Sequence, residues 1–195
     1  MKRPRQQRAE ATRQKILDAA EELFNERGYE KTSMNALAEA AQVSIGGLYE
    51  WLRNKEQVLT AVAERHMDVA TTRILERLAD SADLDMAAQI KIVLEEGLSL
   101  HRAKPQLHRF LYSEAPRPPQ LQAKLRAFDA QLEQTLTKHL QGQGLSKGKA
   151  ELQAAIVART GQALLHEFVL DEELPFSYEH RLEALHKTLC DLMQV

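Results

Sequence analysis

The sequence predicts an all-α fold, with three helices in the first sixty residues and six more in the remainder. Two observations lead to this prediction. Apolar residues recur at the three- and four-residue spacing of amphipathic helices along nearly the whole chain, and no stretch alternates convincingly like a strand. Proline, glycine, serine and asparagine residues divide the chain into helix-sized segments, as helix starts and stops require.

The first helix is expected over Ala9–Arg27, followed by Gly28 as its C-cap. Its apolar side chains fall on one face, at Ile16, Leu17, Ala20, Leu23 and Phe24. Ahead of it, residues 1–8 carry four basic and no acidic side chains. This arm is suited to contact with DNA phosphates, although a disordered solubilising tail would have the same composition.

Two short helices joined by a tight turn are expected next. Ser33 can cap the first of them, whose buried side comprises Leu37, Ala38 and Ala41. Gln42 and Val43 form the turn, and Ser44 can cap the second, in which Leu48 points to the core. This spacing is typical of a helix-turn-helix, whose second helix lies in the DNA major groove, so DNA binding is the leading hypothesis.

Six further helical segments follow. Asn54 can cap the first of them, and Pro105 can open the third, because proline is tolerated in a first helical turn. The stiff Pro116–Pro119 stretch and the Gln141–Gly144 loop are the clearest breaks. The expected ranges are Lys55–Ala79, Leu84–Arg102, Pro105–Ser113, Pro119–Leu140, Lys147–Leu170 and Ser177–Met193.

Composition agrees with a cytoplasmic regulator. The net charge of −2 argues against nucleic-acid binding over the whole surface and for contact confined to the basic end. Cys190 is the single cysteine, which excludes an internal disulfide framework and fits a reducing compartment. The sequence shows no apolar run of membrane-spanning length and no signal-peptide pattern, so no membrane contact is expected.

Two faces near the C-terminus have the pattern of packing surfaces. Ala154, Ala158, Gly161 and Leu165 recur every three or four positions, and the small side chains among them would let another helix approach closely. Leucines form a second stripe at Leu182, Leu185, Leu189 and Leu192. Both faces could pack inside one subunit or against a second copy. The second alternative is favoured because helix-turn-helix proteins usually need two copies to span two half-sites.

The first sixty residues resemble the tetracycline-repressor-type (TetR/AcrR) family of regulators. The resemblance is dense and specific, whereas the rest of the chain matches the family only in its run of six helices. The matching positions are Thr12-Arg13, Ile16-Leu17, Ala19-Ala20, Leu23-Phe24, Gly28-Tyr29, Thr32-Ser33-Met34, Leu37-Ala38, Ala41, Val43-Ser44, Gly46, Leu48-Tyr49 and Asn54-Lys55-Glu56.

The resemblance implies an all-helical homodimer that binds double-stranded operator DNA. Residues 1–54 would be the DNA-binding domain, and residues 55–195 the ligand-binding and dimerisation domain. Ser33 and Lys55 match phosphate-contacting positions of the family, and a second group matches positions that face the major groove or its walls. With Arg5 of the arm and the capping Ser44, the expected DNA-binding set is Arg5, Ser33, Asn35, Ser44, Ile45, Gly46, Gly47, Tyr49, Trp51 and Lys55.

The resemblance also implies an effector cavity enclosed by the fourth to seventh helices and a dimer interface made by the last two. Apolar or amphipathic character selects the cavity candidates Met67, Ile74, Leu98, His101, Phe110, Tyr112 and Phe128. These side chains favour a hydrophobic or aromatic small molecule. The expected interface residues are Ala154, Ala158, Gly161, Leu165, Leu182, Leu185 and Leu189.

The function expected is that of a repressor released from its operator by a small effector. The alternative is a DNA-binding regulator or architectural protein without an inducer. All seven histidines lie outside the first sixty residues, and none has the spacing of a metal motif, so neither a metal nor another cofactor is expected. An enzyme is not expected either, because no catalytic or phosphate-binding motif is present.

The sequence departs from the family's pattern at the turn of the helix pair. Gln42 stands where that turn usually has glycine. If the turn needs a left-handed backbone there, a residue with a side chain costs roughly 1 kcal/mol.

Overall fold

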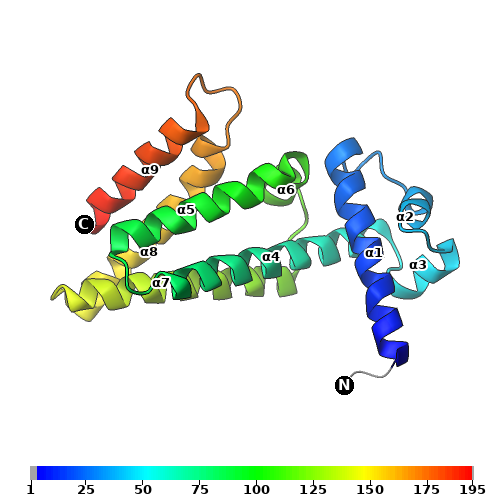
Figure 1. Cartoon of the computed structure of the whole chain (residues 1–195), viewed down its shortest axis with the longest axis horizontal. Coiled ribbons are helices and arrows are strands. Elements are labelled where there is room, and N and C mark those ends of the chain that lie inside the picture. Colours follow the sequence, from blue (N-terminus) through cyan, green and yellow to red (C-terminus); the bar gives the residue numbers. More distant parts are fainter. Residues whose placement is uncertain (1–3, 195) are drawn as a thin grey trace. The chain divides into compact units, whose positions relative to one another are not determined.

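The computed structural model describes residues 4–194, with side chains from residue 7 onward, and every regular element in that range is helical (Figure 1). None of these helices has both the length and the apolar character needed to cross a bilayer. In chain order they are α1 (Pro4–Arg27), α2 (Met34–Ala40), α3 (Ile45–Trp51), α4 (Lys55–Asp80), α5 (Met86–Ala103), α6 (Pro105–Ser113), α7 (Pro119–Gly142), α8 (Lys147–Leu164), a π-helical turn η1 (Leu165–Val169) and α9 (Tyr178–Met193).

The chain forms two compact units. The head unit comprises the described residues up to Met67 together with Lys104–Gln122. The body unit comprises Asp68–Ala103 and Ala123 onward. The division expected from the sequence, between residues 54 and 55, differs from this one because the first half of α4 and all of α6 pack with the N-terminal helices.

The core of the head unit is built around α1. Ile16, Leu17 and Ala20 are completely buried, and they pack with Leu37 of α2 and Leu48 of α3. Side chains of α4 and α6 complete this core, which explains why both helices belong to the head: Val58, Leu59, Val62 and Leu107. Ala115, just after α6, packs with them. A single apolar face on α1 therefore organises five helices.

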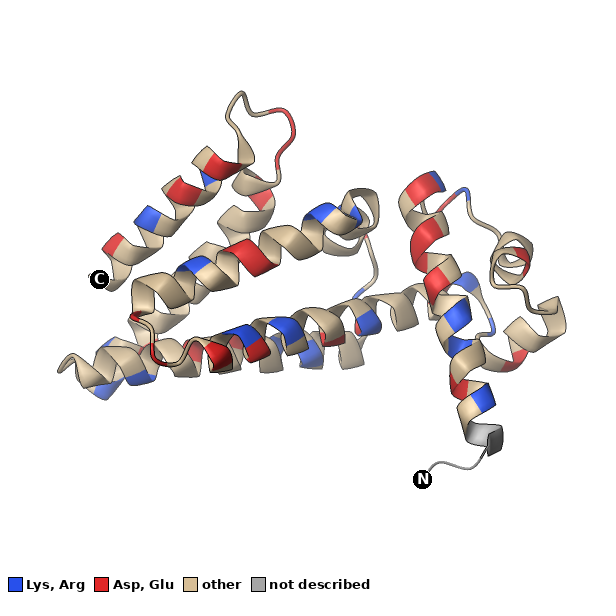
Figure 2. Cartoon of the chain, viewed as in Figure 1, with Lys and Arg blue, Asp and Glu red and all other residues tan. Residues whose placement is uncertain are grey.

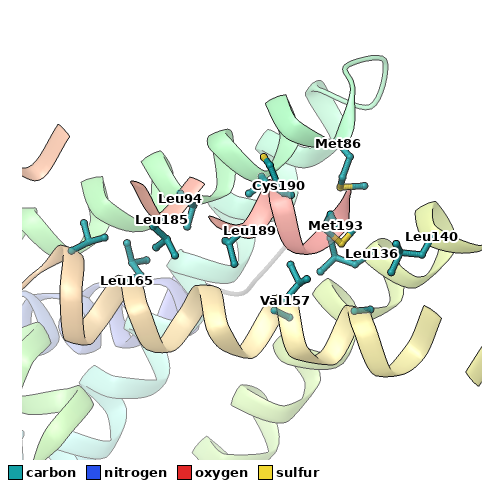
Figure 3. Packing of buried hydrophobic residues seen from close by; sticks show 14 of the residues in the cluster. Met86, Leu94, Leu136, Leu140, Val157, Leu165, Leu185, Leu189, Cys190 and Met193 are labelled. Atoms are coloured by element: carbon teal, nitrogen blue, oxygen red, sulfur yellow. The ribbon is translucent and has the colours of Figure 1, made fainter. Parts of the chain in front are cut away.

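The core of the body unit brings together α5, α7, α8, η1 and α9 (Figure 3). Leu185, Leu189 and Met193 project from α9 toward α8 and η1, where they share one cluster with Val157 and Leu165. Cys190 is also buried here, and burial raises the pKa of its thiol, as do nearby carboxylates. Cys190 is thus a small core residue of α9.

Helix boundaries agree with the sequence-based ranges to within two residues, except at the start of the first helix and at the end of the segment from Lys147, where α8 stops at Leu164 and the π-helical turn follows. The first helix begins at Pro4 instead of Ala9, so the expected basic arm is helical from Pro4 onward. Proline is well tolerated in a first helical turn. Helix α5 begins at Met86 instead of Leu84, because the Asp85 carboxylate accepts a hydrogen bond from the amide of Ala88, at 2.8 Å, and so caps the helix.

Candidate DNA interface

The turn between α2 and α3 is the sharpest feature of the head unit. Gln42 has φ of +56°, in the left-handed region, as its position in place of glycine predicts. The amide of Gln42 donates to the carbonyl of Glu39, and the amide of Val43 donates to that of Ala38, both at 3.0 Å. These two bonds close the end of α2 and set the direction in which α3 leaves.

Serine side chains cap both helices of the pair, as predicted. Ser33 Oγ accepts a hydrogen bond from the amide of Ala36 at 3.2 Å, and Ser44 Oγ accepts one from the amide of Gly47 at 3.0 Å. Each cap satisfies a backbone donor that has no partner inside its helix. Helix α3 has only seven residues, so this local support is large relative to its own hydrogen bonding.

Helix α3 divides sharply into a buried side and an open side. Leu48 is its only buried residue and is completely inaccessible to solvent. By contrast, Ile45, Tyr49 and Trp51 are 39%, 47% and 42% exposed, which is unusual for large apolar side chains. A short helix anchored by one leucine and presenting three such residues outward has the form of a contact surface.

The two glycines of α3 differ in the space that surrounds them. A Cβ at Gly47 would lie 3.1 Å from Ser44 Oγ, so the cap itself leaves little room for a side chain. A Cβ at Gly46 would meet nothing within 4 Å. The chain thus imposes no packing requirement for glycine at position 46, and the missing side chain leaves the backbone open to an external contact.

The helix pair carries no positive charge of its own. Figure 2 shows acidic residues on α2 and α3, and the sequence identifies them as Glu39 and Glu50. The nearest cations flank the pair, at Lys31 before α2 and Arg53 after α3, and both are exposed. Attraction to phosphates would therefore act at the edges of the helix pair.

Lys55 is positioned more tightly than the sequence indicates. Its ammonium group donates to the carbonyl oxygens of Tyr29 at 2.9 Å and Glu30 at 3.3 Å, and it lies 4.2 Å from the centre of the Tyr29 ring. Burial and the neighbouring Glu30 and Glu56 carboxylates raise the pKa of Tyr29. Lys55 therefore ties the start of α4 to the turn after α1, in addition to any role at phosphates.

Most of the expected DNA-binding positions lie on this surface. Ser33, Asn35, Ser44, Ile45, Gly46, Tyr49 and Trp51 are exposed, while Gly47 and Lys55 are half-buried. Arg5 lies outside the residues whose side chains the structure describes.

The residues expected to line an effector cavity are divided between the two units. Met67, Phe110 and Tyr112 belong to the head, and Ile74, Leu98, His101 and Phe128 belong to the body. Phe110 stacks on Tyr29 with ring centres 5.1 Å apart, which makes it part of the head core. The body unit also forms a cavity of about 490 Å³, which contains none of the seven expected residues; its lining is Ala82, Leu84, Asp85, Met86, Ala87, Gln89, His139 and Gln143.

Six of the seven side chains expected at a dimer interface lie in the core of their own subunit, and Leu182 is half-buried against the same core. Gly161 shows the reason, because a Cβ there would lie 3.1 Å from Leu189 Cδ1. The small residues of α8 admit α9 of the same chain, so this face has no surface left for a second copy. The buried members of the set are Ala154, Ala158, Gly161, Leu165, Leu185 and Leu189.

A polar network in the head joins helices that are far apart in sequence. The Arg65 guanidinium of α4 reaches Asp18 at 2.7 Å and Glu21 at 2.6 Å, both on α1. Lys104, just before α6, contacts Glu21 and Glu22 at 2.8 Å. Beside this network, His66 of α4 and His108 of α6 are hydrogen-bonded through their rings at 3.2 Å. Sequence reasoning missed these contacts, since separations of 42 to 83 residues leave no local pattern.

Comparison with family models places both parts of the chain in one group. Residues 16–62 match the model described as bacterial regulatory proteins, tetR family. Residues 85–194, more than half of the chain, match the tetracyclin repressor-like C-terminal domain.

One relative is similar to this chain in sequence, and two solved structures are similar to it in fold. The HTH-type transcriptional regulator UidR of Escherichia coli K12 is 30% identical over 121 residues, which are 62% of this chain and 60% of that protein. The fatty acid degradation regulator FadR from Bacillus halodurans superposes with a TM-score of 0.71 at 19% identity, covering 97% of this chain and 96% of that chain. AibR in complex with isovaleryl coenzyme A and operator DNA gives 0.62 at 21% identity, covering 91% and 97%. The two superpositions establish the shared fold.

Proposed function

Because this chain belongs to the tetR family of bacterial regulatory proteins, and is thus a DNA-binding transcriptional regulator, we propose that it is a ligand-responsive repressor acting as a homodimer. One observation supports the DNA-reading part most strongly. Helix α3 holds Leu48 in the head core while it exposes Ile45 and Tyr49 one helical turn apart. A recognition helix needs this combination of rigid anchoring and an open face.

The exposed residues of the helix pair have different proposed roles. Ile45 supplies an apolar surface of the kind that contacts a thymine methyl group, and Tyr49 adds a hydroxyl that can donate to a phosphate. Gly46 lets the backbone approach closely. Ser33, at the N-terminus of α2, adds a phosphate contact beside the free amides of that helix.

The dimer forms through the side of α8 that α9 leaves open. Leu152 and Ile156 are 65% and 48% exposed, and Arg159 and Ala163 continue the same stripe. The same spacing of four, three and four residues separates Ala154, Ala158, Gly161 and Leu165, which we call the internal stripe. Each residue of the internal stripe lies two positions after one of these four, so the two stripes lie on nearly opposite sides of the helix. We define Leu152, Ile156, Arg159 and Ala163 as the outer stripe of α8.

A hydrophobic or aromatic small molecule is the proposed effector. It would release the operator by binding more tightly to a state in which the two recognition helices no longer match their half-sites. The alternative is a regulator or architectural protein without an inducer. Thermal unfolding against a broad hydrophobic library separates the two, since only the first predicts a ligand that both raises the melting temperature and weakens operator binding.

DNA binding is tested by selecting a bound sequence from the genome and measuring its affinity by fluorescence anisotropy. Tyr49→Ala should weaken binding by roughly tenfold to a hundredfold, because each good interface contact contributes about 1–3 kcal/mol. Phe176→Ala is the matched control, since Phe176 is an exposed aromatic residue of the body unit, at 59%. Equal affinities of the two variants would remove α3 from the interface.

A further inference from the structure

The paired imidazoles of the head unit form the candidate site. His66 projects from α4 and His108 from α6, with His66 Nε2 and His108 Nδ1 3.2 Å apart. Their ring centres are 5.3 Å apart, and the planes are inclined by 47°. His108 is buried and His66 is half-buried. Two ring nitrogens thus meet in a sheltered place between helices that are distant in sequence.

The distance between these nitrogens fits two ligands of one metal ion. Zinc–imidazole bonds are about 2.0–2.1 Å long, so two nitrogens at a tetrahedral angle lie about 3.3–3.4 Å apart. At a right angle, as in an octahedral site, the same bonds separate them by about 2.9 Å. The observed 3.2 Å lies between these values. An ion could bind between the two nitrogens with little movement of either helix, if the hydrogen-bonded proton moved to the other ring nitrogen of the donor imidazole.

The electrostatic surroundings also permit a cation. The two nearby positive groups, Arg65 and Lys104, are held by carboxylates: Arg65 by Asp18 and Glu21, and Lys104 by Glu21 and Glu22. Three acids therefore face two bases in this network. Burial lowers the pKa of His66, with Glu21 and Lys104 acting in opposite directions. Metal ions bind the neutral form of imidazole.

We propose that His66 and His108 together bind one divalent transition-metal ion in the head unit. Imidazole nitrogen selects zinc, cobalt, nickel or copper over magnesium and calcium, which prefer oxygen ligands. The ion would link α4 to α6 within the head core and would stabilise the fold in its presence. This inference is independent of the proposed DNA contacts, and either can fail without the other.

Binding is measured on the full chain carrying no histidine tag, after treatment with a chelator. Cobalt titration should produce visible absorption that saturates at one ion per chain, and zinc should displace the cobalt. The intensity of the band distinguishes tetrahedral from octahedral coordination and so reports how the rest of the shell is filled. Zinc should also raise the melting temperature by mass action.

Matched variants locate the ion. His66→Gln and His108→Gln should each weaken cobalt binding by at least about tenfold, because each removes one ligand of the site. His180→Gln, an exposed position on α9, should bind cobalt like the unaltered chain. Circular dichroism and the metal-free melting temperature show whether each variant remains folded.

Three outcomes would overturn the proposal. The absence of saturable cobalt binding would mean that the two rings share only a hydrogen bond. Equal binding by folded His66→Gln, folded His108→Gln and the unaltered chain would place the ion elsewhere. If His66→Gln does not fold, a zinc-induced stabilisation that survives in folded His108→Gln would have the same meaning.

Discussion

The open face of α3 and the small-residue face of α8 are both predicted from the sequence as contact surfaces, and the structure treats them oppositely. On α3, Ile45 and Tyr49 remain exposed. On α8, Ala154 and Gly161 are covered by α9 of the same chain. The spacing of residues along a helix indicates that one of its faces makes a contact. Only the packing of the remaining helices shows whether that contact is with the same chain or with another molecule.

The largest expected effect is on stability, and it compares Leu189 of α9, which packs on the internal stripe of α8, with Ile156 of the outer stripe. Leu189→Ala should lower the free energy of unfolding by about 2–5 kcal/mol, because Leu189 is buried against Gly161 and a cavity would remain. Ile156→Ala, on the outer stripe, should change subunit stability by less than about 0.5 kcal/mol. Urea unfolding measures both.

Sedimentation supplies the complementary measurement. Ile156→Ala should weaken self-association, whereas folded Leu189→Ala should not. If Leu189→Ala dissociated the dimer while Ile156→Ala had no effect, the dimer interface would lie on the side of the internal stripe and not on the outer stripe.

Overpacking of the internal stripe should have the next largest effect. Gly161→Leu should cost about 1–3 kcal/mol, because a side chain there must displace Leu189. Gly148→Leu is the control, since a Cβ at Gly148 meets nothing within 4 Å. It should be neutral or slightly stabilising, because leucine favours helix more than glycine does. Equal melting temperatures for the two variants would argue against close packing of α8 on α9.

The helix caps give a smaller effect. Ser44→Ala should destabilise the head by about 1 kcal/mol, because it removes the acceptor for the Gly47 amide. Ser146→Ala should have little effect, since the Ser146 side chain makes no capping hydrogen bond at the start of α8. Denaturant midpoints compare them, and a Ser146→Ala loss as large as that of Ser44→Ala would contradict the capping argument.

The smallest expected change is a gain. Gln42→Gly should stabilise the protein by about 0.5 kcal/mol, because relief of the left-handed strain exceeds the added freedom of the unfolded chain. Gln42→Ala keeps the strain and should be neutral or slightly destabilising. A less stable Gln42→Gly protein would mean that the glutamine side chain contributes something that its backbone geometry does not show.

The local features of the head could be predicted from the sequence because their causes lie within a few residues. The caps at Ser33, Ser44 and Asn54 and the left-handed turn at Gln42 are confirmed. The membership of α6 in the head could not be predicted. It depends on Leu107 reaching the core of α1 and on Lys104 reaching Glu21, 83 residues away.

In the body, the sequence could predict helices but not their neighbours. The ranges of α7 to α9 follow from proline, glycine and apolar spacing, and the structure agrees within a few residues, apart from the π-helical turn that ends the segment from Lys147. The partner of each face depends on how five helices pack together, which a single pattern does not encode. The His66–His108 pair illustrates the same limit, since neither residue stands in a recognisable metal motif.

The crowding beside Ser44 Oγ has a practical consequence for any attempt to retarget this regulator to a new operator. Position 47 is constrained by the start of its own helix, because a side chain there would crowd the Ser44 cap, which contributes about 1 kcal/mol. Positions 45, 46 and 49 are open, and a combinatorial library confined to them would explore new base preferences without sacrificing the scaffold.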